Sequence, residues 1–479
     1  MNYAVIFHTL GIVINFGAAF MIPPFIVAVL YGEADAMYFA VCFVICAALG
    51  FILSRIKPAN KKFYAKEGYI IVAMSWIILS LIGSMPFYLS GYIPSYIDAL
   101  FESVSGFTTT GASILSNVEN LSNGMLFWRI FTHWIGGMGV LVFIIAVLPL
   151  TGGENMHIMR AETPGPSVGK LVPKLRKTAI YLYAIYFSLT VFQTVLLIIN
   201  KMPIFDAVCI AMGTAGTGGF GIKNSSMASY GVTINVIVTV FMLLFGVNFN
   251  FYFLILMRKF KDAFKMSEVL WYFIIFIVVA LFITVNIYNP EKGFLLSFHD
   301  ATFTVSSVMT STGYVTEDYN KWPEFSRSLL MIVMFIGACA SSTGGGIKVS
   351  RFIIYIKYIA NEMSTLIHPR SVKVIQFDGK PVGEKTLKSA MMFLAVYVII
   401  YMVSSVIVSI DNYDLVTTFT AVAAAFNNIG PGFGLVGPTG NFSIFSPLSK
   451  IVLMLDMLAG RLEIFPLLLL FTPSVWKKR

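Results

Sequence analysis

The chain has 479 residues, of which 57% are hydrophobic and 12% are charged, and its formal net charge is +10. Soluble domains carry about 25% charged residues, so a soluble fold of this composition would leave large apolar patches facing water. An ordinary soluble enzyme is therefore excluded. Disorder is excluded as well, because 43 Phe and 22 Tyr are too many apolar rings for a solvated chain. The composition predicts an integral membrane protein.

Ten apolar runs are long enough to cross a bilayer, since a helix needs about 20 residues to span the hydrocarbon core. We expect these crossings near residues 4–30, 36–56, 68–90, 125–150, 178–200, 232–257, 268–289, 327–358, 387–410 and 448–472. The first run lacks a basic start and a small-residue cleavage site, which favours a span over a signal peptide. An even number of crossings places both termini on the same side.

Basic residues are concentrated in alternate loops. Of the 33 Lys and Arg, 25 lie in the segments 55–66, 160–177, 258–265, 348–388 and 477–479. Because basic loops mark the cytoplasmic side of membrane proteins, both termini are predicted to be cytoplasmic. The net charge therefore records topology, and we expect no nucleic-acid partner.

Four segments between the crossings are moderately apolar but too short to span. Three of them open with Asp-Ala, and a glycine follows each Asp by 13 positions; the fourth repeats this spacing without the Asp. The pairs are Asp98 and Gly111, Asp206 and Gly219, Asp300 and Gly313, and Thr417 and Gly430. This regularity indicates internal duplication. We expect a two-helix extension at 1–60 and four repeats at 61–150, 151–266, 267–375 and 376–479.

Each short segment is predicted to be a re-entrant helix followed by non-helical backbone. Such backbone survives at membrane depth only when it is buried in protein or lines a cavity. Asp98, Asp206 and Asp300 are expected to be N-caps of these helices. The Thr-, Gly- and Asn-rich stretches that follow can point carbonyl oxygens at a cation, and the helix C-termini add partial negative charge. The predicted fold is an all-α integral membrane protein with four pseudo-fourfold repeats around one pore.

The short stretches after these helices resemble the four filter loops of the Trk/Ktr/HKT superfamily of potassium transporters. The matching sequences are TTTGA at 108–112, TGGF at 217–220, STGY at 311–314 and NNIGPG at 427–432. Further segments resemble that family's inner helices, namely WIGGMG at 134–139, SSTGGGIK at 341–348 and GRLEI at 460–464. Two extra N-terminal spans favour the TrkH branch over the KtrB branch.

The resemblance implies a potassium filter with one glycine from each loop. The implied filter residues are Thr109, Thr110, Gly111, Thr217, Gly218, Gly219, Ser311, Thr312, Gly313, Asn428, Ile429 and Gly430. In the second loop Gly218 and Gly219 are adjacent, and the spacing favours Gly219. Glycine rather than serine at position 111 points to potassium over sodium. The fourth loop departs most from the family pattern, because Asn and Ile replace its Thr residues.

The polar interruption at 341–348 is either a loop between two ordinary helices or, by resemblance, an intramembrane gating loop below the filter. Its deformable part is Gly344, Gly345 and Gly346, and Lys348 is expected at the mouth of a cytoplasmic cavity. Arg461 lies inside a predicted span, where ionisable residues usually face a pathway or a partner. By resemblance it is a barrier to cations.

A structural ion pair of Arg461 with Asp456 or Glu463 is the alternative, but neither acid lies three or four positions away on the same helical face. A sodium- or proton-coupled secondary transporter of another class is the second hypothesis. A transporter of that class would have more acidic residues inside its spans than Asp456 and Glu463, the two expected from this sequence.

The resemblance also implies partners. They are potassium as the transported ion, a cytosolic nucleotide-binding regulatory subunit of the TrkA type, and a second copy of the chain in a homodimer. We expect a multi-pass protein of the cell (inner or plasma) membrane, in contact with lipid, with no cofactor in this chain. No nucleophile–base constellation is evident, and the G-x-G-x-x-G pattern at 216–221 follows no strand, so the chain is predicted not to be an enzyme.

Overall fold

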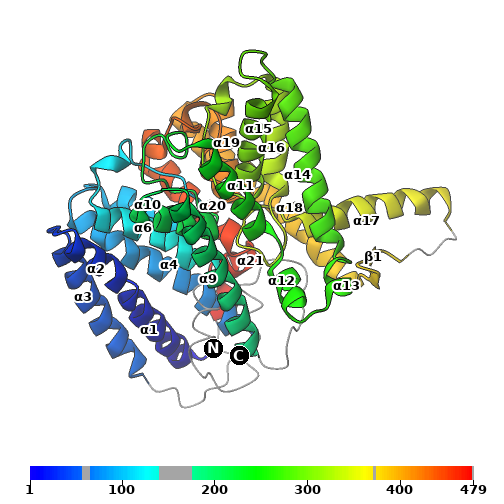
Figure 1. Cartoon of the computed structure of the whole chain (residues 1–479). Helices are drawn as coiled ribbons and strands as arrows, with labels where there is room; N and C mark the ends of the chain where they lie inside the picture. Colours follow the sequence, from blue (N-terminus) through cyan, green and yellow to red (C-terminus); the bar gives the residue numbers. More distant parts are fainter. Residues whose placement is uncertain (57–64, 140–174, 370–373, 477–479) are drawn as a thin grey trace.

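A computed structural model of the chain describes residues 1–56, 65–139, 175–369 and 374–476. Figure 1 shows a helical protein. In the described residues its only strands are β1 (Gln376–Phe377) and β2 (Lys380–Pro381), an antiparallel pair in which Gln376 faces Pro381. The expected repeat boundaries at 60/61 and 150/151 lie outside the described residues.

The N-terminal extension consists of α1 (Tyr3–Ala19), α2 (Ile22–Leu30) and α3 (Ala36–Ser54). Small residues let α1 and α3 approach closely, as is common between membrane helices. A Cβ on Gly11 would lie 2.5 Å from the backbone nitrogen of Ser54, and one on Gly50 would lie 2.5 Å from Asn15 Oδ1. Only Phe39, Cys42, Cys46 and Gly50 of α3 are buried, and its other residues are mostly apolar, as expected for a surface that faces lipid.

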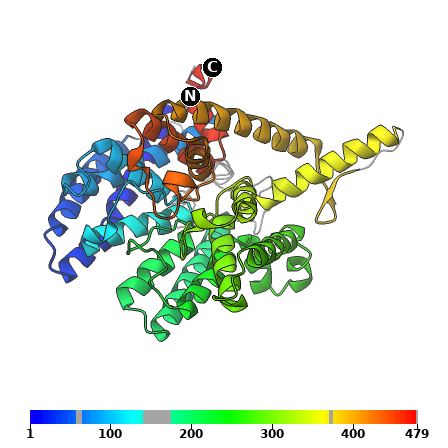
Figure 2. The same ribbon diagram turned by 90° about the horizontal axis from the view of Figure 1, so that it is seen from above.

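The rest of the chain repeats one arrangement four times: a long helix, a short helix, then an inner helix. The long helices are α4 (Ala65–Leu89), α9 (Leu175–Ile199), α14 (Ser267–Asn286) and α18 (Glu384–Val408). The short helices are α5 (Tyr96–Phe107), α10 (Ile204–Gly216), α15 (Phe294–Met309) and α19 (Leu415–Phe426). The inner helices begin with α6 (Asn123–Gly137), α11 (Val232–Gly246), α16 (Glu324–Ile336) and α20 (Pro447–Arg461). Figure 2 shows these groups around a common centre.

Shorter elements complete the described chain. The remaining helices are α12 (Phe249–Leu256), α13 (Phe260–Ala263), α17 (Val349–Ile367), α21 (Phe465–Leu470) and α22 (Pro473–Trp476). The 3₁₀ turns are Val118–Asn120, Tyr319–Lys321, Ser409–Asp411, Gly434–Val436 and Phe442–Ile444.

Six of the described helices are long and apolar enough to cross a membrane, and a seventh crossing results if α11 and α12, bent by 88°, count as one. The expected span 327–358 is interrupted between Ile336 and Val349, in agreement with the polar interruption expected at 341–348. The expected spans 232–257 and 448–472 are also broken, which was not expected, and α6 ends at Gly137, beyond which the span 125–150 leaves the described residues. The breaks Val247–Asn248 and Leu462–Ile464 are too short to lower the mean hydropathy of a window of about 19 residues enough to reveal them.

The first and the last described residues lie on one face of the molecule (Figure 1). The hydroxyl of Tyr3 donates a hydrogen bond of 3.0 Å to the carbonyl of Trp476. We call this side the terminal face.

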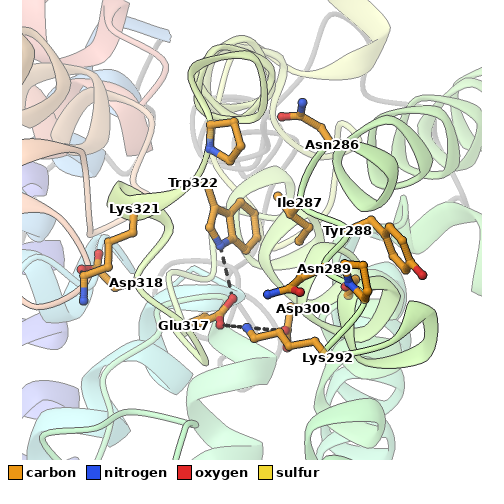
Figure 3. Close-up of a pocket in the computed structure, with 13 residues that line it drawn as sticks. Asn286, Ile287, Tyr288, Asn289, Lys292, Asp300, Glu317, Asp318, Lys321 and Trp322 are labelled. Atoms are coloured by element: carbon orange, nitrogen blue, oxygen red, sulfur yellow. Dashed lines mark hydrogen bonds and ion pairs between the residues drawn. The ribbon is translucent and has the colours of Figure 1, made fainter.

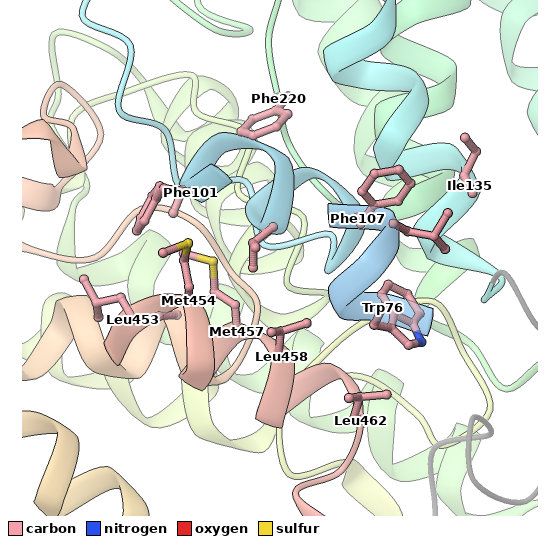
Figure 4. Close-up of a cluster of buried hydrophobic side chains, with 14 of the residues drawn as sticks. Trp76, Phe101, Phe107, Ile135, Phe220, Leu453, Met454, Met457, Leu458 and Leu462 are labelled. Atoms are coloured by element: carbon pink, nitrogen blue, oxygen red, sulfur yellow. The ribbon is translucent and has the colours of Figure 1, made fainter. Parts of the chain in front are cut away.

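The largest hydrophobic cluster packs the first and last repeats together. Figure 4 shows Met454 and Met457 of α20 beside Phe101 of α5, with Trp76 of α4 nearby. All four side chains are buried, and the flexible methionines fill the irregular space between the helices. Because lipid tails are as apolar as these side chains, tight packing rather than escape from water holds the helices together. The cluster therefore fixes the short helix α5 in place.

Candidate functional site

The short helices begin earlier than the sequence predicted. The cap of α5 is Ser95, whose hydroxyl accepts a hydrogen bond from the backbone N–H of Asp98, and the cap of α19 is the Asp414 carboxylate. Asp98 and Asp206 lie in the first turns of their helices, and Asp300 lies in the middle of α15. The expectation that Asp98, Asp206 and Asp300 are N-caps was wrong, because the helices begin upstream of these residues and their N-caps are Ser95, Pro203 and Gly293. The acids in the first turns still complement the helix dipole.

The loops that follow the four short helices share one backbone conformation. Each has two residues with positive φ, two positions apart. These pairs are Thr109 and Gly111, Thr217 and Gly219, Ser311 and Gly313, and Asn428 and Gly430. Positive φ is rare for residues other than glycine, so its recurrence at four non-glycine positions is not coincidental.

One backbone hydrogen bond also recurs in every loop. Its donor is the N–H of the residue just before the loop's positive-φ glycine, and its acceptor is the carbonyl of the residue five positions before the donor. It runs from Thr110 to Ser105 (2.9 Å), from Gly218 to Gly213 (3.0 Å), from Thr312 to Ser307 (2.8 Å) and from Ile429 to Ala424 (2.9 Å). The four loops therefore have the same backbone despite their different sequences.

The loops close a ring in chain order. The positive-φ glycine of each loop packs against the next loop. It contacts the carbonyl oxygen of the residue that comes just before the equivalent glycine there. A Cβ added to Gly111 would lie 2.0 Å from Gly218 O, and one added to Gly219 would lie 1.9 Å from Thr312 O. A Cβ added to Gly313 would lie 2.2 Å from Ile429 O, and one added to Gly430 would lie 2.8 Å from Thr110 O. Glycine is needed here both for its positive φ and for the close approach.

Gly219, not Gly218, is the structural equivalent of the other three ring glycines, because it has the positive φ and the contact with the next loop. Gly218 is small for a different reason. A Cβ there would lie 2.2 Å from the His133 ring, which packs 4.1 Å from the ring of Phe220. His133 Nδ1 lies 2.8 Å from the carbonyl of Gly106 in α5.

A buried ion pair joins the first two loops. Arg129 Nε donates to Glu102 Oε1 at 2.6 Å, and a second nitrogen of Arg129 donates to the carbonyl of Gly221 at 3.0 Å. Glu102 Oε2 accepts from the N–H of Ile114 at 3.0 Å. The further hydrogen bonds offset the cost of removing both charges from water. Sequence reasoning missed this pair, although a glutamate in a re-entrant helix and an arginine inside an expected span were available signals.

The polar interruption between α16 and α17 lies directly against the ring. The N–H of Gly345 donates to the hydroxyl of Ser311, a ring residue. An added Cβ would lie 2.7 Å from Thr310 O at Gly344 and 2.1 Å from Asn427 O at Gly345. Residues 337–348 thus pack on the C-terminal ends of α15 and α19.

The same interruption pairs with the bend between α11 and α12. The N–H of Cys339 donates to Gly246 O at 3.1 Å, and the N–H of Phe249 donates to Ser341 O at 3.0 Å. The two breaks therefore satisfy each other's backbone groups, which the interior of a membrane protein requires.

Lys348 lies inside the protein and not at a cavity mouth. Its side chain folds back so that Nζ donates to the carbonyl of Gly344, and only 3% of the residue is exposed. Gly346 has a positive φ, and a Cβ there would lie 2.6 Å from Gly337 Cα, so the two ends of the interruption touch. The lysine thus braces the loop from within.

Arg461 bridges three segments beneath the ring. Its guanidinium donates to Thr343 O at 2.7 Å, to Gly137 O at 2.7 Å and to Gly136 O. These carbonyls belong to the interruption 337–348 and to the end of α6. The guanidinium therefore crosses between the third and first repeats.

The acids near Arg461 have other partners. Glu463 forms an ion pair with Arg351, and Asp456 Oδ1 accepts from the hydroxyl of Ser404 at 2.7 Å. Asp456 and Glu463 are not the only acids within the helical body, because Glu102 and Glu268 are also buried. The count of intramembrane acids from the sequence was therefore too low.

A cavity of about 560 Å³ lies beside α15 (Figure 3), and no residue of the ring lines it. Within it Lys292 pairs with Glu317 and, at 3.5 Å, with Asp300, while Trp322 Nε1 donates to Glu317 at 3.2 Å. The hydrogen bond from Lys292 to Glu317 raises the pKa of the lysine. These contacts tie the segment before α15 to the segment after the third loop. Among the described residues, no group of three or more His, Cys, Asp or Glu is placed to hold a metal ion.

Comparisons with known proteins agree with this geometry. The family model for the TrkH cation transport protein matches residues 35–289 and 273–478. The chain is 35% identical to the Trk system potassium uptake protein TrkH of Salmonella typhimurium and 34% identical to that of Escherichia coli K12, over all of both chains in each case. It is also similar to the crystal structure of the potassium transporter TrkH from Vibrio parahaemolyticus, with a TM-score of 0.89 and 31% identity over all of both chains.

Proposed function

The chain belongs to the TrkH family of cation transport proteins, and we propose on that premise that it mediates potassium uptake across the cell membrane through the ring of four loops. It is a multi-pass membrane protein and not an enzyme. The ring is the observation that carries the proposal. Carbonyl oxygens in such a ring replace the hydration shell of an entering ion, and the C-terminal ends of the four short helices add negative potential.

The interruption 337–348 and Arg461 form the proposed gate. The loop lies against the ring, and we place the guanidinium in the path of an ion leaving it, because it spans from Thr343 to the end of α6. Two unit charges about 4 Å apart repel by about 4 kcal/mol at an effective dielectric constant near 20. A cation therefore passes only after the guanidinium or the loop moves. Gly344, Gly345 and Gly346 give the loop the freedom to do so.

The remaining features follow from the family and from the surface. We place the terminal face in the cytoplasm, because the charge pattern of the sequence assigns both termini to the cytoplasmic side. We propose a homodimer, since α17 projects from the helical body (Figure 2) and carries exposed apolar residues at helical spacing. These are Ile356, Ile359, Met363 and Leu366. A cytosolic nucleotide-binding subunit would dock on the terminal face.

Flux measurements on reconstituted vesicles test the proposal. Wild-type protein should take up rubidium and be weakly inhibited by sodium, and Gly111→Ser should lose much of that discrimination, because its side chain enters the ring next to Gly218 O. Equal rubidium and sodium uptake by both proteins would overturn the filter assignment. Repeating the assay with imposed proton or sodium gradients separates passive conduction from coupled transport, the alternative mechanism.

A further inference from the structure

Glu268, one residue into α14, holds both ends of the interruption 337–348. Its Oε1 accepts from the N–H of Ala340 at 2.6 Å and from the N–H of Ser350 at 3.1 Å. Its Oε2 accepts from the side-chain amide of Asn248, at the bend between α11 and α12, at 3.1 Å. One buried carboxyl group thus joins the entry to the loop, its exit and the neighbouring bend.

The residue before Glu268 is held by the β1–β2 hairpin. Asp378 Oδ1 accepts from the N–H of Ser267 at 2.7 Å and from its hydroxyl, so the hairpin provides the side-chain cap for α14. Asp378 and Gly379 both have positive φ, as in the tight two-residue turns that close hairpins. The hairpin is also tied to α17, because Lys357 Nζ donates to Gln376 O at 2.8 Å.

A cavity of about 670 Å³ separates these two sets of contacts and leaves room for the hairpin to move. Glu268, Ala340 and Ser350 line one part of it, and Asp378 and Lys380 line another. Asp262 lines the same cavity but is exposed. Displacement of the hairpin would remove the cap of α14 and disturb the adjacent Glu268.

We propose that Glu268 is a positioning residue that keeps the gating loop closed, and that the hairpin acts on it through Asp378 and Ser267. This inference rests on the gating role given to the loop in the proposed function. The hairpin is then the element through which an event at the terminal face opens the pore. The connection requires no change in the filter loops themselves.

The chain carries its own reporter of loop opening. Cys339 lies in the loop beside Ala340 and is fully buried, as are the other three cysteines. In a background of Cys42→Ala, Cys46→Ala and Cys209→Ala, the rate at which a small membrane-permeant thiol reagent modifies Cys339 measures opening. Rubidium flux through vesicles of the same proteins measures conduction.

Glu268→Ala should raise both rates about tenfold, because it removes the acceptor for both loop ends. Glu268→Gln keeps one acceptor oxygen for Ala340 and Ser350 and should stay within about twofold of wild type. Asp378→Gly keeps the turn but removes the cap, and should raise both rates about threefold; Asp378→Asn, which still accepts from Ser267, should not. Asp262→Ala is the matched control and should change neither rate.

Unchanged Cys339 reactivity in Glu268→Ala would overturn the inference. An effect of Glu268→Ala without any effect of Asp378→Gly would overturn the part assigned to the hairpin. Faster Cys339 modification with unchanged flux would support the positioning role of Glu268 and would instead count against the gating role of the loop in the proposed function.

Discussion

The first and third filter loops are braced differently from the second and fourth. In the first, the hydroxyls of Thr108 and Thr110 lie 2.8 Å apart, and in the third, those of Thr310 and Thr312 lie 2.7 Å apart. Each pair is anchored by a hydroxyl that donates to the preceding turn of the short helix. These two loops therefore support themselves.

The second and fourth loops depend on residues from elsewhere. Glycines replace both threonines in the second loop, and His133 fills the space beside Gly218. In the fourth loop the hydroxyl of Tyr397 donates to Asn427 Oδ1 at 2.9 Å, and the amide of Asn428 donates to Thr110 Oγ1 at 3.0 Å. The comparison teaches that the common backbone of the ring, and not its side chains, is what the four repeats preserve.

Substitution of a ring glycine should have the largest effect and should break the common backbone. Gly219→Ala places a Cβ 1.9 Å from Thr312 O. The positive φ of residue 219 alone costs a side-chain-bearing residue roughly 1–2 kcal/mol. We expect rubidium uptake to be abolished. Gly430→Ala, with a closest contact of 2.8 Å, should retain part of it. Gly231→Ala is the control, because its Cβ would meet no described atom within 4 Å, and reduced uptake there would discredit the comparison.

Removing Asn428 should come next and should affect the fourth loop selectively. Its amide also donates to Met457 O at 2.9 Å, so Asn428→Ala leaves two buried acceptors with fewer partners. Each such loss costs about 1–3 kcal/mol. We expect weaker discrimination of rubidium against sodium at unchanged surface expression, measured by competition flux. Wild-type selectivity in this variant would mean that the fourth loop, like the first, supports itself.

The threonine pairs allow a finer test within the self-supported loops. Thr312→Val removes one partner of a hydroxyl pair, at a cost of about 1 kcal/mol. Thr110→Val removes the equivalent hydroxyl and also the acceptor for Asn428, so it should lower the unfolding temperature of the detergent-solubilised protein further. Equal shifts in the two variants would indicate that the contact between the first and fourth loops adds no stability.

The sequence predicted the ring glycines but not their supports. The spacing of 13 residues identified Gly111, Gly219, Gly313 and Gly430, because a positive φ combined with a close approach of the next loop requires glycine at the same place in each repeat. The supports of the second and fourth loops come from distant segments, as His133 illustrates, and no local pattern reveals them. The break at 341–348 was predicted, but the bend between α11 and α12 was missed for a related reason: its backbone groups are satisfied by Cys339 and Ser341, more than 90 residues away.

The smallest expected effect is that of changing a helix cap. The first short helix, α5, and the fourth, α19, differ in the residue that caps them. Asp414 caps α19, and the hydrogen bonds from Thr417 to its carboxylate lower the pKa of Asp414, whereas the Ser95 cap of α5 does not titrate. Because the folded-state pKa lies below the unfolded value of about 3.9, the carboxylate stabilises the folded protein above that pH. This stabilisation is lost as the pH falls through the folded-state pKa.

Asp414→Ser converts the fourth cap to the chemistry of the first. Wild type should therefore unfold at a slightly higher temperature than Asp414→Ser at pH 6, and the difference should decrease as the pH falls below about 4. The effect should be small and should weaken further in high salt, since Asp414 is exposed and its interactions are screened. A difference that persists unchanged at pH 3 would show that the cap acts through its shape and hydrogen bonding and not through its charge.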